Sequence, residues 1–160
     1  MSTQAHRFES ASSTQTLAEA LAEYYAANPA LKRGSSLSPQ AQEFFHCHDT
    51  VHVLYGCGTS MPEEAIVKLA SLFGTTAGVS VLKGYRLHES LDIYRKLPLA
   101  STLVALLMAP YLIARTIWRC VRQRSTWPWA QHEQYLNTPL SDLRARFGIK
   151  VAHAQRHSAA

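Results

Sequence analysis

Apolar side chains recur along most of the chain at intervals of three and four residues, the spacing that gathers them on one face of an α-helix. Leu17, Leu21, Tyr24 and Tyr25 form the first such stripe. No run alternates apolar and polar residues for long enough to indicate a β-sheet. The pattern therefore predicts an all-α protein, a single-domain bundle of about six helices.

Residues that favour helix ends mark where these helices start and stop. Thr16 and Glu19 have the spacing of a capping box, as do Ser60 and Glu63. Gly56, which follows the second apolar stripe, is typical of a left-handed helix end. These signals predict helices over Thr16 to Asn28, Ser38 to Tyr55, Ser60 to Gly74, Val79 to Lys96 and, with Thr138 as its cap, Pro139 to Gly148.

The two ends of the chain are polar and lack this periodicity. We expect residues 1–14 and residues 151–160 to form flexible tails, which leaves a helical domain over residues 15–150. The N-terminus has no apolar core of a signal peptide and is too weakly basic for a transit peptide. Cys47, Cys57 and Cys120 are odd in number and lack C-x-x-C spacing, which favours free thiols and a cytoplasmic location.

The low fraction of charged residues and one long uncharged segment are compatible with contact with lipid. Charged residues make up 17% of the chain, less than the roughly 25% of an average soluble domain. The segment from Leu97 to Ala114 has 18 residues and no charge, although Pro98 and Pro110 interrupt it. A buried core helix is the first interpretation, a helix on a membrane surface or along a lipid cavity is the second, and a membrane span is the weakest.

The charge of the chain is modestly basic. Its net charge is +5, and Arg115, Arg119, Arg122 and Arg124 gather late in the sequence. Such a patch suits phosphate groups of lipid or nucleic acid, and it equally suits a solvated helix face. No signature of a sequence-specific nucleic-acid module is present, so we expect no such partner.

The strongest chemical signal is a histidine cluster in the second predicted helix. A helix turns by about 100° per residue, so His48 and His52 share one face, with Asp49 at its edge and His46 on another side. Two imidazoles one turn apart with a carboxylate are a familiar divalent-metal ligand set. Beyond the predicted reversal, Glu63 or Glu64 can supply a fourth ligand; Glu64 is preferred because Glu63 has the competing role of capping.

Two nitrogens and two oxygens suit zinc, iron, manganese or cobalt better than calcium. Glu43 and His46 also form an E-x-x-H pair. A di-iron bundle would need a second copy on another helix, and the sequence has none, so this interpretation is rejected.

The spacing of these residues resembles a known family signature. His48, Asp49, His52 and, after eleven residues, Glu64 are similar to the H-D-x(2)-H-x(11)-E motif of the coenzyme Q (ubiquinone) biosynthesis protein 4 family. The stretch from Trp129 to Ile149 also resembles the family's C-terminal part. The resemblance covers about residues 38–150 and suggests a bacterial relative. It implies that His48, Asp49, His52 and Glu64 bind a divalent metal, usually zinc.

The same resemblance implies an all-helical protein of ubiquinone biosynthesis. We expect it to bind a polyprenyl lipid or quinone precursor and to contact other quinone-biosynthesis proteins and, in a homodimer, a second copy of itself. We expect it in the cytoplasm, peripherally on the cytoplasmic face of the inner membrane. One hypothesis is a metal-dependent lyase acting at the C1 decarboxylation and hydroxylation of a prenylated hydroxybenzoate, with catalysis borne by the metal. The alternatives are a non-catalytic lipid-binding scaffold and, more weakly, a metal-dependent hydrolase of a soluble substrate.

Overall fold

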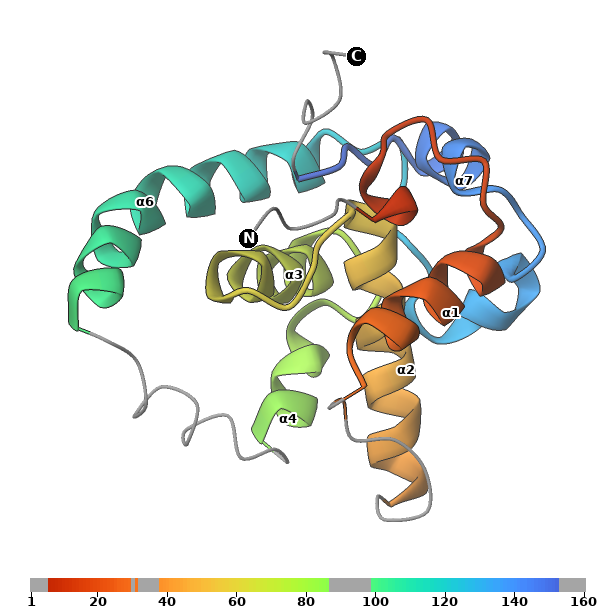
Figure 1. Ribbon diagram of the computed structural model, residues 1–160, viewed down its shortest axis with the longest axis horizontal. Coiled ribbons are helices and arrows are strands. Elements are labelled where there is room, and N and C mark those ends of the chain that lie inside the picture. The colour runs from red at the N-terminus through yellow and green to blue at the C-terminus, as the bar shows by residue number, and fades with distance from the viewer. Residues whose placement is uncertain (1–5, 30, 32–37, 87–98, 153–160) are drawn as a thin grey trace.

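Helices make up most of the described part of the chain, as the periodic apolar positions predict (Figure 1). The computed structural model describes residues 6–29, 31, 38–86 and 99–152 and, for residues 85, 86 and 99–108, the backbone alone. The α-helices are α1 (Leu17–Ala27), α2 (Pro39–Tyr55), α3 (Met61–Phe73), α4 (Val81–Arg86), α6 (Leu99–Val121) and α7 (Leu140–Phe147). Short 3-10 turns are η1 (Arg7–Glu9), η2 (Gly78–Ser80) and η3 (Trp129–Tyr135). The all-α prediction is confirmed.

The capping residues in the sequence set the ends of the first helices. The Thr16 side chain accepts a hydrogen bond from the backbone N–H of Glu19, whose carboxylate accepts one from the backbone N–H of Thr16. Ser38 caps α2, and Gly56 ends it in the left-handed conformation, with φ of 62°. These contacts satisfy helix-end groups that would otherwise lose hydrogen bonds on burial.

Helix α2 is the centre of the fold. It contacts α1, α3, α7 and the turns η1 and η3, while α6 packs mainly on α3 (Figure 1). Residues 47–55 of α2 are all buried, which is the behaviour of a helix surrounded by others. The polar residues within this stretch are therefore enclosed by protein, and each needs a partner.

Helix α6 differs from the sequence prediction because Pro110 lies inside it instead of interrupting it. A helix-interior proline removes one backbone hydrogen bond, and packing along α3 offsets that loss. Of the segment expected as a buried core helix, the structure describes the side chains of residues 109–114 alone, and Tyr111 and Ile113 among them are exposed. No helix within the described ranges has the length and apolar character that crossing a bilayer requires.

The packed domain extends into both of the predicted tails. Phe8 in η1 is completely buried and belongs to the hydrophobic core, so residues 6–14 pack on the domain and are not a flexible tail. At the other end, Val151 and Ala152 are buried, and the backbone N–H of Ala152 donates to the Tyr55 carbonyl at 2.7 Å. Residues 1–5 and 153–160 lie outside the described ranges. The domain therefore extends beyond both predicted boundaries, because Phe8, Val151 and Ala152 are buried in it.

Two predicted helix starts need correction. The cap of α7 is Pro139, not Thr138, because the backbone of Pro139 is non-helical, with ψ of 142°, and the helix begins only at Leu140. The helix expected from Val79 begins instead with the turn η2 and becomes α-helical at Val81. Its predicted continuation over residues 87–96 lies outside the described part of the chain.

Gly84 of α4 is required by close packing. A Cβ atom at this position would collide with the ring of Phe44 on α2. We expect Gly84→Ala to lower the free energy of unfolding by about 1–3 kcal/mol through overpacking, despite its better helix propensity. Urea denaturation measures this change. The matched control is Lys83→Ala, at an exposed neighbouring position, which is expected to change the free energy of unfolding by less than about 0.5 kcal/mol. A Gly84→Ala protein that is more stable than the parent would contradict the packing argument.

Candidate metal centre

Helices α2 and α3 bring three predicted ligands together. His48 and His52 lie one turn apart on α2, and Glu64 lies in the first turn of α3, after the reversal that begins at Gly56. One ligand atom from each of the three residues lies within 4.8 Å of the others. Both imidazoles are buried, whereas the Glu64 side chain is about one-third exposed. The cluster therefore has buried nitrogen ligands with a carboxylate at its edge.

The spacing of these atoms suits a small divalent cation. Nε2 of His48 and Nε2 of His52 are 3.2 Å apart, and Nε2 of His52 is 3.2 Å from Oε1 of Glu64. Nε2 of His48 is 3.7 Å from Oε2 of Glu64. Ligand atoms bound tetrahedrally to zinc at about 2.0–2.1 Å are separated by about 3.3 Å. The distances between these three side chains are therefore close to those expected around a bound zinc ion.

The hydrogen-bond partners of His52 indicate how its ring is oriented in the cluster. Nδ1 of His52 is 2.8 Å from the carbonyl oxygen of Gly58, which can only accept, so Nδ1 carries a proton. In the neutral imidazole, Nε2 then presents a lone pair to the Glu64 carboxylate and to His48. A hydrogen bond from one ring nitrogen to a backbone carbonyl is how metal-ligating histidines are commonly oriented. A divalent cation would satisfy the facing acceptors; a protonated His52 paired with Glu64 is the metal-free alternative.

The electrostatics favour a neutral His48 beside an ionised Glu64. Burial lowers the pKa of His48, more than its hydrogen bond with Glu64 raises it. Burial alone would raise the pKa of Glu64, but hydrogen bonds with His48 and His52 lower it well below its usual range. A neutral imidazole and a carboxylate are the protonation states in which these groups bind metals.

Asp49 is buried on α2, but its carboxylate is not among the atoms gathered within 4.8 Å. It lies near Tyr24, whose ring packs against that of His52 with centroids 5.2 Å apart. Burial, and then the charges of Asp49 and Glu64, raise the pKa of Tyr24 above its usual value. The buried Tyr24 hydroxyl has no hydrogen-bond partner among the described residues. Tyr24 is thus a polar group near the cluster that the sequence did not single out.

The two adjacent glutamates of α3 have different roles. The Glu63 carboxylate accepts hydrogen bonds from the backbone N–H and the hydroxyl of Ser60, so it caps the helix. The Glu64 carboxylate faces the two imidazoles instead. Of the two glutamates, Glu63 is therefore the one that caps the helix and Glu64 is the one that faces the imidazoles.

His46 does not join this cluster. Its Nδ1 is 3.2 Å from Nε2 of His132, a residue of η3 that the sequence reasoning did not consider. Cys47 also faces His132. The separation of 86 residues between His46 and His132 left no local pattern from which this contact could be predicted.

Comparisons of this chain with protein-family models, with curated proteins and with solved structures find no match. The resemblance to the ubiquinone biosynthesis protein 4 family therefore stays a prediction that rests on the motif. The described geometry by itself supports a cluster of side chains able to hold a metal ion.

Proposed function

We propose that this chain is a metal-binding protein of ubiquinone biosynthesis that handles a prenylated hydroxybenzoate. Metal binding is supported by the ligand atoms of His48, His52 and Glu64, which lie within 4.8 Å of one another, and by the Gly58 carbonyl that orients His52. The role in ubiquinone biosynthesis is supported by the resemblance of His48, Asp49, His52 and Glu64 to the family motif. The ligand atoms and the spacing favour zinc, with iron, manganese or cobalt as alternatives. Three gathered protein ligands are also the number that catalytic zinc sites use, because a further position must stay open for substrate.

The reaction proposed is loss of carbon dioxide from the prenylated hydroxybenzoate. When bound, a divalent metal supplies Lewis-acid stabilisation of the negative charge that develops on the ring. His48, His52 and Glu64 would hold the metal, and the Gly58 carbonyl would keep His52 oriented. The Tyr24 hydroxyl, buried and without a partner among the described residues, is suited to donate a hydrogen bond or proton nearby. Its raised pKa keeps that hydroxyl protonated.

The exposed side of α6 supports contact with lipid. Tyr111 and Trp118 are more than half exposed, and the guanidinium groups of Arg115 and Arg122 lie over their rings. The distance from the Arg122 guanidinium carbon to the Trp118 ring centroid is 4.4 Å. Exposed aromatic rings beside cations are typical of helices that lie at a membrane surface. A small hollow next to α6, lined in part by Arg115, Arg119 and Lys150, adds positive charge suited to an anionic head group.

A non-catalytic scaffold is the second candidate function. The three gathered side chains come from α2 and α3, so a bound ion would join two helices of the core. Such an ion would stabilise the fold whether or not a substrate reacts. Elemental analysis and lipid mass spectrometry of the purified protein test the binding that both functions share. Metal-dependent release of carbon dioxide from a prenylated hydroxybenzoate then distinguishes the lyase, and bound lipid without release favours the scaffold.

The α6 surface makes a separate prediction. We expect the double variant Trp118→Ser, Arg122→Gln to bind vesicles containing anionic lipid at least about tenfold more weakly than the parent protein, because both apolar insertion and charge attraction are lost. Vesicle co-sedimentation measures the affinity. The matched control is Arg146→Gln on α7, which removes another exposed arginine stacked on an aromatic ring, that of Tyr135. Equal binding by the α6 variant and the parent would remove membrane contact from the proposal.

A further inference from the structure

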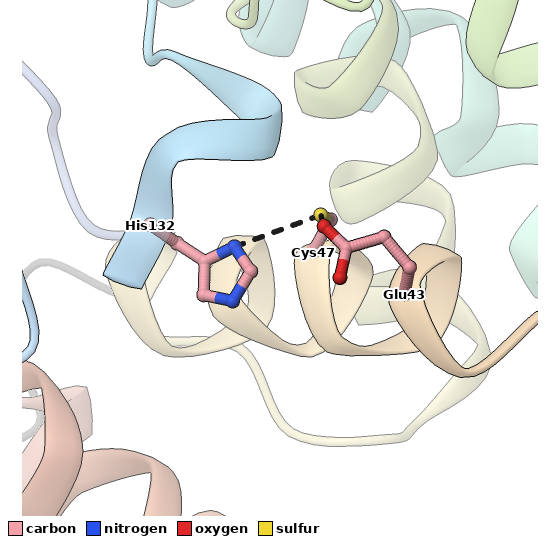
Figure 2. Close-up of side chains that lie close together, drawn as sticks. All are labelled: Glu43, Cys47 and His132. Carbon is pink, nitrogen blue, oxygen red and sulfur yellow. Dashed lines mark hydrogen bonds between the residues drawn. The ribbon is translucent and has the colours of Figure 1, made fainter. Parts of the chain in front are cut away.

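A second group of metal-ligand side chains lies on another side of α2. Glu43 and Cys47 are one turn apart on that helix, and His132 approaches them from η3 (Figure 2). One ligand atom of each residue lies within 4.8 Å of the others. Cys47 and His132 are almost completely buried, whereas Glu43 is exposed. Two donors are therefore held inside the protein while the third can be reached from solvent.

The distances match those between ligands of one zinc ion. Sγ of Cys47 is 3.7 Å from Nδ1 of His132 and 3.4 Å from Oε1 of Glu43. With zinc–sulfur bonds of about 2.3 Å and zinc–nitrogen or zinc–oxygen bonds of about 2.0–2.1 Å, a tetrahedral ion separates sulfur from such a neighbour by about 3.6 Å. Metal binding at Cys47 would thus require little movement of the three side chains.

His46 supplies the outer contact that a metal-binding histidine requires. Its Nδ1 lies 3.2 Å from Nε2 of His132, the ring nitrogen opposite the one that faces Cys47. The two rings are 4.4 Å apart between centroids. When His132 donates through Nε2 to His46, its Nδ1 presents a lone pair toward Cys47. A hydrogen bond from the second ring nitrogen is the usual means of orienting a ligating imidazole.

We propose that Glu43, Cys47 and His132 form a second divalent-metal site that prefers zinc or cobalt and is separate from the His48, His52 and Glu64 cluster. Thiolate and imidazole ligands favour these metals over magnesium or calcium. On binding, a metal–sulfur bond forms, the Cys47 S–H bond breaks, and the proton passes to solvent without any change of oxidation state. Because Glu43 is exposed, the remaining coordination position is open to water. This site does not depend on the proposed role in quinone biosynthesis.

Cobalt(II) is the probe that separates the two sites. Metal-free protein, kept reduced and titrated with cobalt(II), is expected to develop a thiolate-to-cobalt charge-transfer absorption in the near ultraviolet. The His48, His52 and Glu64 cluster contains no sulfur and cannot give this band. We expect Cys47→Ser to abolish the band, while Cys57→Ser, a matched change at another buried free cysteine, leaves it intact. Glu64→Gln is also expected to retain it.

Two further variants test the site without altering the buried thiol. Glu43→Gln is an exposed change, and we expect it to weaken cobalt binding, read from the band, by at least about tenfold because a ligand is lost. His46→Ala is expected to weaken it by about 10–100-fold through loss of the outer contact. The proposal is overturned by the absence of the band, by a band that persists in Cys47→Ser, or by unchanged cobalt affinity in both Glu43→Gln and His46→Ala.

Discussion

Glu64→Gln is expected to lower the metal affinity of the His48 and His52 cluster by more than the roughly 10–100-fold typical of outer-shell changes. The substitution preserves the size of the side chain but removes the negative charge that faces both imidazoles at 3.2–3.7 Å. Glu64 is partly exposed, so the variant should keep its fold. His48→Ala is expected to lose metal in the same way, since it removes a ligand nitrogen.

Isothermal titration of metal-free protein with zinc measures this loss, and metal-dependent thermal stability provides a second readout. Metal at 100 times its dissociation constant adds about 2.7 kcal/mol to the free energy of unfolding when only the native state binds it. To isolate this cluster from the Cys47 site, the titration is performed in the Cys47→Ser background. We expect Glu64→Gln in that background to lose most of the metal-dependent stabilisation.

The neighbouring glutamate offers a matched control. Glu63→Gln makes the same chemical change one residue away, at a side chain that caps α3 through Ser60. Glutamine also serves at this capping position, so little stability should be lost. We expect zinc affinity close to that of the parent. Full metal content in both Glu64→Gln and His48→Ala would show that the cluster is a polar network of the core and not a metal centre.

Arg144→Leu is expected to destabilise the protein by about 3–5 kcal/mol. Arg144 of α7 is 4% exposed. Its guanidinium donates hydrogen bonds to four backbone carbonyls, those of Phe8, Ser10, Val53 and Leu54. The substitution would leave these buried acceptors without their donor and loosen the N-terminal turn from the end of α2.

The burial of this guanidinium also affects its pKa. Burial lowers the pKa of Arg144 to about 10, so the group remains charged at neutral pH, compensated by carbonyl dipoles. Denaturant unfolding followed by circular dichroism measures the loss of stability. Arg146→Leu, an exposed arginine on the same helix, serves as control and should cost less than about 1 kcal/mol. Similar stability of the two variants would refute the bridging role of Arg144.

Much of the helical framework was predictable from local sequence. Thr16, Ser38 and Gly56 act through contacts within a few residues, and the side chains that make those contacts are visible in the chain itself. The placement of His48 and His52 on one face followed equally from helical geometry. The last helix was predicted one residue out of place because Pro139, expected in its first turn, has a non-helical backbone with ψ of 142°. The backbone on either side of Pro139 bonds to the distant segment before α1, through Thr138 with Leu17 and Leu140 with Gln15.

By itself, the sequence determined the all-α class, the main helix ends and the pairing of two histidines, because each depends on backbone geometry over one or two turns. Only the tertiary structure decided which side chains meet across helices. Helix packing placed Glu64 against both imidazoles and brought His132 next to Cys47. It also brought the Phe8 carbonyl within hydrogen-bond distance of the Arg144 guanidinium. These contacts join residues far apart in the chain, and their formation depends on how whole helices pack, which local periodicity does not encode.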